Sequence, residues 1–123
     1  MLADTKAFSG FAVPDIEAAR EFYGDKLGLE VSEENGMLTL HLAGDRPTLI
    51  YPKADHEPAG YTILNFTVEN IEQAVDELSS RGVAFESYDG FDQDERAIFR
   101  GGGPPIAWFK DPAGNVLSVI KTD

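Results

Sequence analysis

Apolar and polar residues follow the two-residue period of β-strands in several short runs of the chain and the period of a helix in two others. Residues 8–13 form a short, mostly apolar run that predicts a strand. The apolar residues of the next segment recur at helical spacing, at Ile16, Ala19, Phe22 and Tyr23. Asp15 precedes them and is a suitable N-cap, so we expect a strand that leads directly into an amphipathic helix.

Three more strands are predicted in the first half of the chain, over residues 29–32, 37–43 and 47–51. The sequence Glu34-Asn35-Gly36 between the first two indicates a hairpin, because Asn-Gly supplies the positive φ values of a type I′ turn. The second run places its leucines on one face and Thr39 and His41 on the other. The first half is therefore predicted to be β-α-β-β-β.

The second half repeats the first. Val13-Pro14-Asp15-Ile16-Glu17-Ala18-Ala19 and Val68-Glu69-Asn70-Ile71-Glu72-Gln73-Ala74 share four residue types in register, and Asn70 takes the N-cap place of Asp15. Two copies with a period of about 55 residues are too few for a solenoid and predict a pseudo-symmetric pair of modules. We expect one domain over residues 1–123, with module 1 at about 6–53, a polar linker at 53–60 and module 2 at about 61–121.

The second module is expected to have a strand over residues 63–68, a helix that ends near Gly82, and a strand over residues 83–88. A hairpin over residues 106–120 closes the chain. Its turn is Asp111-Pro112-Ala113-Gly114, where Pro112 presets φ and Gly114 tolerates the exit geometry.

Residues 89–105 form an acidic stretch followed by three glycines and two prolines. Only residues 97–99 have strand character, so we expect a long, solvated flap, and long loops in compact domains are often functional. The acidic part lacks the glycine and the terminal glutamate of a calcium loop, and the glycines lead into prolines rather than into a phosphate-binding helix.

The formal net charge is −12, which repels nucleic acid and anionic membranes and favours a cationic ligand. An acidic surface also serves solubility, so both interpretations stay open. The chain has no cysteine, which excludes disulfides, thiolate metal sites and cysteine nucleophiles. The N-terminus lacks a signal-peptide pattern and no run approaches the roughly 18 apolar residues of a membrane span, so a cytoplasmic protein is expected.

The two histidines give little support for catalysis or metal binding. His41 is predicted in mid-strand, opposite the leucines, and His56 lies in the linker between two acidic residues. A surface position is the ordinary role for each, because an imidazole ligand needs partners at defined distances. A triad of Ser118, His41 and an acid lacks a nucleophile elbow.

Four motifs, in this order and spacing, carry a resemblance to a known family. They are the Val13-Pro14-Asp15-Ile16 entry to a helix with Ala19 and Phe22-Tyr23, the Leu27-Gly28-Leu29 exit, the repeated Val68…Ile71-Glu72…Ala74 entry, and Trp108-Phe109-Lys110-Asp111-Pro112-Ala113-Gly114-Asn115. The chain resembles the vicinal oxygen chelate superfamily, also called the glyoxalase, bleomycin-resistance and extradiol dioxygenase superfamily. The resemblance implies an α+β fold of two tandem βαβββ modules, with a curved mixed sheet around a cleft, helices on the outer face, and a homodimer.

Enzymes of this superfamily hold a divalent metal in the cleft with His and Glu or Gln residues. The resemblance places the four ligand positions at Phe8, at one of Leu49, Ile50 or Tyr51, at Ile63 and at Ser118. These side chains are not ordinary ligands for such a metal. We therefore expect no metal and no other cofactor.

The resemblance and the strand alternation together predict a small-molecule cleft. Its predicted ligand-binding residues are Phe8, Tyr51, Ile63, Asn65, Trp108 and Ser118. Trp108 is an aromatic wall of the cleft or, as the favoured alternative, a core or dimer residue. The leading hypothesis is a metal-independent binding protein of the bleomycin-resistance type that sequesters a drug or metabolite, with unknown catalytic residues.

Two alternatives stay open. One is a metal-free lyase or isomerase that uses Asp94, Glu95 or Tyr51 as acid or base, and a strongly perturbed carboxylate facing the cleft would favour it. The other is a degenerate domain kept for dimerisation, which a cleft filled by side chains would favour. The fold alone does not decide among them, because one scaffold hosts many chemistries.

Overall fold

A computed structural model describes residues 1–122 of the chain. The chain divides into two compact units, one from Met1 to His56 and one that begins at Glu57. The boundary lies inside the segment that the sequence predicts to be a linker. Seven strands in two mixed sheets and two α-helices make up the described residues, which confirms the α+β class.

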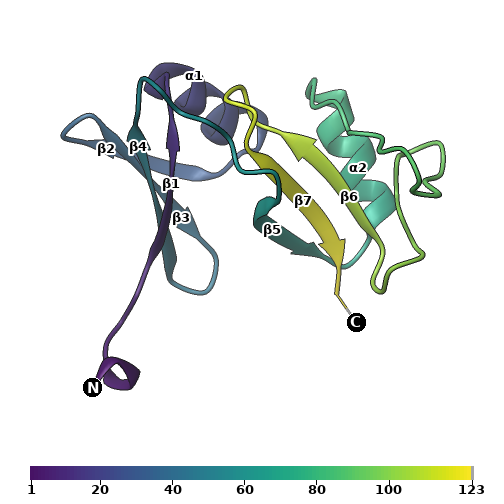
Figure 1. Ribbon diagram of the computed structural model, residues 1–123, viewed down its shortest axis with the longest axis horizontal. Helices are drawn as coiled ribbons and strands as arrows, with labels where there is room; N and C mark the ends of the chain where they lie inside the picture. Colours follow the sequence, from purple (N-terminus) through teal and green to yellow (C-terminus); the bar gives the residue numbers. More distant parts are fainter. Residues whose placement is uncertain (123) are drawn as a thin grey trace. The chain divides into compact units, whose positions relative to one another are not determined.

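The first unit follows the predicted order β-α-β-β-β (Figure 1). After a short 3-10 turn η1 (Leu2–Asp4), its elements are β1 (Ser9–Val13), α1 (Ile16–Arg20), β2 (Glu30–Glu34), β3 (Met37–Leu42) and β4 (Arg46–Pro52). The sheet order is β1-β4-β3-β2, with β1 parallel to β4 and the other pairs antiparallel. Helix α1 packs against β3 and β4, where Leu38, Leu40 and Ile50 are fully buried.

The predicted start of the first helix and the predicted hairpin are confirmed. Asp15 accepts a hydrogen bond from the Ala18 backbone N–H at 3.2 Å, and Asn35 and Gly36 have φ values of 55° and 76°. The rest of the helix differs from the prediction, because residues Glu21–Lys26 form a π-helical stretch, η2. Over so few residues, apolar spacing does not distinguish an α-helical turn from this wider one.

The second unit has β5 (Thr62–Val68), α2 (Ile71–Ser80), β6 (Ile106–Lys110) and β7 (Val116–Lys121). The sheet order is β5-β7-β6, with β5 parallel to β7 and β6 antiparallel to it. Asn70 caps α2 by accepting a hydrogen bond from the Gln73 backbone N–H at 3.0 Å. Helix α2 packs against β7 and buries Ile71 and Val75.

The predicted strand over residues 83–88 is wrong. With β6 this segment makes one isolated bridge, between Phe85 and Phe109, which includes the hydrogen bond from the Glu86 N–H to the Trp108 carbonyl at 2.8 Å. The pairing stops there because Ile106 of β6 exchanges both of its backbone hydrogen bonds with Phe99, at 2.8 and 3.1 Å. The backbone groups of Ile106 are therefore not available to pair with Tyr88.

The turn between β6 and β7 is held by the buried carboxylate of Asp111. Its Oδ1 accepts from the backbone N–H groups of Ala113 and Asn115, both at 2.9 Å, and its Oδ2 accepts from the Asn115 side chain at 3.0 Å. Gly114 has φ 88°, and a Cβ placed on it would lie 3.2 Å from Cγ of Pro58. The turn therefore needs glycine here both for its backbone geometry and for the approach of the linker.

No helix among residues 1–122 is long and apolar enough to cross a membrane.

The substitution Gly114→Ala is expected to destabilise the protein. An L-residue in the left-handed region costs about 1–2 kcal/mol, and the contact with Pro58 adds to this. The free energy of unfolding measured in urea should fall by at least that amount. Gly60→Ala is the matched control, since a Cβ there meets no atom within 4 Å, and it should leave the stability almost unchanged. Equal losses in both variants would contradict this account of the turn.

Candidate functional site

Three of the predicted site residues lie in one row on the sheet of the second unit. Trp108 of β6 aligns with Ser118 of β7, and Ser118 aligns with Asn65 of β5. The Ser118 hydroxyl donates a hydrogen bond to Oδ1 of Asn65 at 2.5 Å. Ser118 is fully buried and Asn65 is exposed. The row lies on the face opposite α2, because the neighbouring Phe109 and Leu117 point into the core on the helix side.

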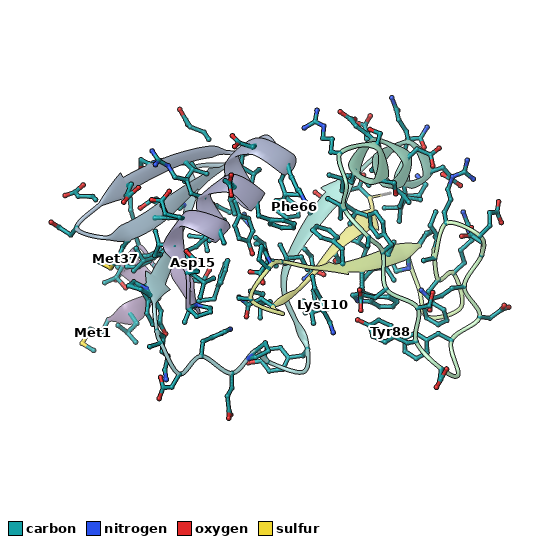
Figure 2. The ribbon with its side chains drawn as sticks, turned by 90° about the horizontal axis from the view of Figure 1, so that it is seen from above. Met1, Asp15, Met37, Phe66, Tyr88 and Lys110 are labelled. Atoms are coloured by element: carbon teal, nitrogen blue, oxygen red, sulfur yellow. The ribbon has the colours of Figure 1, made fainter. Side chains whose placement is uncertain are left out.

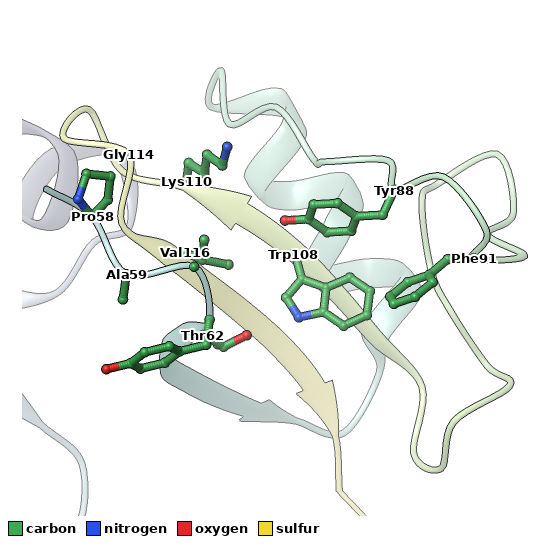
Figure 3. Close-up of a pocket in the computed structure, with 11 residues that line it drawn as sticks. Pro58, Ala59, Thr62, Tyr88, Phe91, Trp108, Lys110, Gly114 and Val116 are labelled. Atoms are coloured by element: carbon green, nitrogen blue, oxygen red, sulfur yellow. The ribbon is translucent and has the colours of Figure 1, made fainter.

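A cavity of about 610 Å³ lies on this face (Figure 3). The end of the linker and the start of β5 form one side, and residues of β6, β7 and the loop after residue 87 form the rest. Eleven residues line it. They are Pro58, Ala59, Gly60, Tyr61, Thr62, Tyr88, Phe91, Trp108, Lys110, Gly114 and Val116.

Aromatic rings build one wall of the cavity. The Trp108 ring centroid lies 5.5 Å from that of Tyr88 and 5.6 Å from that of Phe91. Phe99 stacks on Phe91 at 4.8 Å with an interplanar angle of 23° and supports it from behind. Phe91 is nevertheless 45% exposed and is one of the residues that line the cavity. Exposed aromatic surface of this kind is what a bound organic molecule would cover.

Side-chain hydrogen bonds give the predicted flap a defined conformation. The Gln93 amide donates to the Glu86 carbonyl at 3.0 Å and to the Ala97 carbonyl at 2.8 Å, and it accepts from the Tyr88 N–H at 2.8 Å. The expected short strand over residues 97–99 is reduced to bridges of Phe99 with Gln93 and Ile106. Gln93 therefore fixes the loop that carries Tyr88 and Phe91.

Two arginines attach the same loop to α2. Arg96 makes a two-pronged contact with Asp76, at 2.9 and 3.2 Å, and Arg100 donates to Glu72 at 2.8 Å. Arg100 also pairs with Asp94, whose Oδ1 accepts from the backbone N–H groups of Arg96 and Ile98, both at 2.9 Å. Most of these groups are partly exposed, so each pair is weak and their effect depends on acting together.

The pKa of the Asp94 carboxyl lies below its usual value. Partial burial raises this pKa, but the hydrogen bonds from Arg100 and from the backbone of Ile98 and Arg96 outweigh that effect. A carboxylate held in this way is a poor general base near neutral pH. Glu95 is not held in this way, and its side chain is 82% exposed.

Three titratable side chains line the cavity, those of Tyr61, Tyr88 and Lys110, and the last two come from β6 and the segment beside it. Figure 2 shows both on the side of β6 opposite α2. The Lys110 ammonium lies 3.6 Å from Oε1 of Glu86, and both side chains are partly exposed. Burial raises the pKa of the Tyr88 hydroxyl, and the nearby Glu86 carboxylate raises it further, so Tyr88 is neutral at physiological pH.

The remaining predicted residues lie elsewhere. Phe8 and Tyr51 belong to the first unit and are 67% and 40% exposed. Ile63 is half-buried at the irregular point of β5, where the pairing with β7 skips a residue. In β4, Ile50 is fully buried and aligns with Phe11 and Leu38 of the neighbouring strands, so Leu49 and Tyr51 point to the opposite face.

Trp108 is half-buried and lines the cavity. This is the cleft-wall position, whereas the sequence analysis favoured a core or dimer position. The other wall residues were not predicted from the sequence. Tyr61, Tyr88 and Phe91 lie at or beyond the ends of the predicted strands. Strand alternation therefore does not predict on which face of the sheet their side chains lie. Their one common signal was the clustering of aromatic residues beside Gly and Pro.

The positions that would hold a metal in this fold do not fit one. Phe8 and Ile63 offer no donor atom, and the Ser118 hydroxyl is used in the hydrogen bond to Asn65. Among residues 1–122, no group of three or more His, Asp or Glu side chains could hold a metal ion.

The fold and the sequence together identify the class of protein. Residues 7–119 match the family model described as "Glyoxalase/Bleomycin resistance protein/Dioxygenase superfamily". The chain belongs to this superfamily, as its motifs indicate.

Solved structures of the same fold span nearly the whole chain. A glyoxalase family protein from Enterococcus faecalis is 25% identical, with a TM-score of 0.71 and coverage of 98% of this chain and 99% of that one. TnmS3, an antibiotic binding protein from Streptomyces sp. CB03234, is 22% identical, with a TM-score of 0.69 and 98% of each chain covered. The fosfomycin resistance protein FosX from Mesorhizobium loti is 12% identical, with a TM-score of 0.67 and coverage of 98% and 93%. No curated protein sequence matches the chain significantly.

The substitution Asp94→Asn is expected to lower stability in a pH-dependent way. The folded-state pKa is depressed, so the stabilisation by Asp94 is present above the unfolded-state pKa of about 3.9 and is lost as the pH falls through the folded value. The free energy of unfolding, measured in urea between roughly pH 2 and 6, should be higher for the wild type than for the variant near pH 6. This difference should disappear at the acid end of the range. Asp92→Asn, an exposed change in the same loop, should show no such gap. A gap that is constant with pH would contradict the assignment.

Proposed function

We propose that this protein binds a small organic molecule without a metal ion, in the cavity on the sheet of its second unit. The observation that carries the proposal is the cavity itself, with a volume of about 610 Å³ and a wall made by Trp108, Tyr88 and Phe91. Sites for small molecules are typically concave, of roughly 300–1,000 Å³, and lined by apolar and aromatic groups with a few polar ones.

The chemistry of the ligand positions supports binding without a metal. Three of the four positions at which enzymes of the superfamily carry their ligands hold Phe8, Ile63 and Ser118, and the fourth falls on Leu49, Ile50 or Tyr51. Non-covalent sequestration needs no such ligand. The similarity of fold to an antibiotic binding protein, TnmS3, is in keeping with this role.

The cellular setting belongs to the same proposal. We propose a cytoplasmic protein, since no disulfide marks an oxidising compartment. We also propose that it assembles as a homodimer, as its family resemblance implies.

The enzymatic alternative has less support. The residues predicted as its acid or base, Asp94, Glu95 and Tyr51, are not among the lining residues of the cavity. The depressed pKa of Asp94 also counts against a base role, because it lowers the proton affinity of the carboxylate.

Binding can be tested with naphthylmethanol, a flat and uncharged probe. Trp108 is the single tryptophan of the chain, so its indole N–H gives one unique signal in a ¹H–¹⁵N NMR spectrum. Titration in the presence of EDTA should shift this signal and saturate. Phe91→Ala should weaken binding about tenfold, equivalent to about 1.4 kcal/mol, because it removes an exposed wall ring without opening the core.

The matched control is Phe85→Leu. Phe85 packs on Phe109, on the side of the sheet away from the cavity, so this variant should bind the probe as the wild type does. Binding that is lost in EDTA, or equal weakening by Phe85→Leu and Phe91→Ala, would contradict the proposal.

Native mass spectrometry with metal analysis tests the metal-independent part. We expect the purified protein to carry less than stoichiometric Ni, Zn, Fe or Mn and to have a mass of twice 13.4 kDa. One tightly held metal ion per chain would overturn the metal-independent assignment, and a 13.4 kDa species alone would overturn the dimer.

A further inference from the structure

We propose that the cavity selects planar aromatic compounds that carry an anionic group, and that Lys110 is the residue that determines this selectivity. This inference rests on the proposed binding function and names the chemical class of its ligand. It depends on the orientation of the wall rings and on the charges of the lining residues.

A cation is disfavoured at this wall by the charge beside it. Tyr88 is steeply inclined to Trp108 and Phe91, at interplanar angles of 74° and 69°. The faces of aromatic rings attract cations. Here, however, the Lys110 ammonium lines the same cavity and repels a second positive charge. An ammonium group therefore gains little here.

A flat ring system suits the same wall. Phe99 lies at 23° to Phe91 and at 32° to Trp108, whereas Phe91 and Trp108 are tilted by 49° to each other, so a flat ligand is expected to stack on the Phe91 ring and meet Trp108 at an angle. Phe99 supports one face of Phe91, and Phe91 still exposes 45% of its surface. A planar ligand can cover that surface and gain roughly 25 cal/mol for each Å² of apolar area removed from water.

Lys110 brings a positive charge to the cavity of this acidic protein, with Glu86 as its partner. Lys110 is the one charged side chain among the eleven lining residues, which include no carboxylate. The other ionisable lining groups are the hydroxyls of Tyr61 and Tyr88, and a neutral hydroxyl donates a hydrogen bond to an anion. The net charge of −12 acts over longer distances, where salt screens it beyond about 10 Å. The local cation therefore decides which ligand is held.

Lys110 forms an ion pair with Glu86, but this pair leaves its ammonium group accessible to a ligand. Its distance to Glu86 is 3.6 Å, and the two side chains are 46% and 33% exposed. A partly exposed ion pair of this length is weak, so a carboxylate on the ligand can take the place of Glu86. Glu86 then acts as a competitor for the ammonium group, and its removal should strengthen anion binding.

The test uses three probes with one ring system: naphthoate, naphthylmethanol and naphthylmethylammonium. Their dissociation constants are read from the Trp108 indole signal. We expect naphthoate to bind about fivefold to tenfold tighter than naphthylmethanol, and the ammonium probe to bind no tighter than the alcohol. Lys110→Met keeps the apolar stem and should bring naphthoate to the affinity of the alcohol, whereas Glu86→Gln should tighten naphthoate binding. Lys121→Met is the control for lost charge, since Lys121 lies at the end of β7 and does not line the cavity.

The outcomes separate this inference from the proposed function. The selectivity is overturned, and the binding function still stands, if all three probes bind equally or if the ammonium probe binds most tightly. The same holds if Lys110→Met keeps the preference for naphthoate. A loss of preference in Lys121→Met equal to that in Lys110→Met would also overturn it. If none of the probes shifts the Trp108 signal, the proposed function fails and the inference fails with it.

Discussion

The buried carboxylate of Asp111 is the constraint on which the second unit depends most. It accepts backbone and side-chain hydrogen bonds inside the turn and thereby fixes the register of β6 against β7. That register places Trp108 beside Ser118 and sends Lys110 to the cavity face. The same turn brings Gly114 to the linker at Pro58. One satisfied buried anion therefore sets the position of both the strand residues and the chain segment that border the cavity.

Side-chain contacts also hold the loop over residues 89–105 in place. Gln93 fixes its interior, and Arg96 and Arg100 attach it to α2. None of these contacts is strong alone, because most of the ion pairs are partly exposed. Together they hold Phe91 against Phe99 and Trp108. Among the acidic residues of this loop, Asp94 thus serves its structure, and the loop presents the aromatic Phe91 to the cavity.

The sequence predicted most of the fold and part of the site. Strands, caps and turns were predictable because Asp15, Asn70, Asn35-Gly36 and Gly114 act through local backbone chemistry. The strand at residues 83–88 was not, because its absence depends on the pairing of Phe99, in the irregular loop that leads into β6, with Ile106. Asn65 was predicted at the cleft by strand alternation and Ser118 by the turn motif of the family resemblance, and the two are paired across β5 and β7. Trp108, for which a core or dimer role was favoured, lies in the same row. The cavity also includes Tyr88, Phe91 and Lys110. It forms through tertiary contacts, which the hydrophobic periodicity of the sequence does not predict.

The pairing of Phe99 with Ile106 also covers part of the outer edge of the sheet in the second unit. A strand at the edge of a sheet presents unpaired N–H and C=O groups that can recruit a strand from another molecule. In this protein the outer edge of β6 is covered along its length, by Phe85 and Glu86 at one end and by Phe99 at the other. The segment that encloses the cavity therefore also protects β6 from intermolecular β-pairing. A truncation of this loop would remove the aromatic wall and at the same time open an aggregation-prone edge.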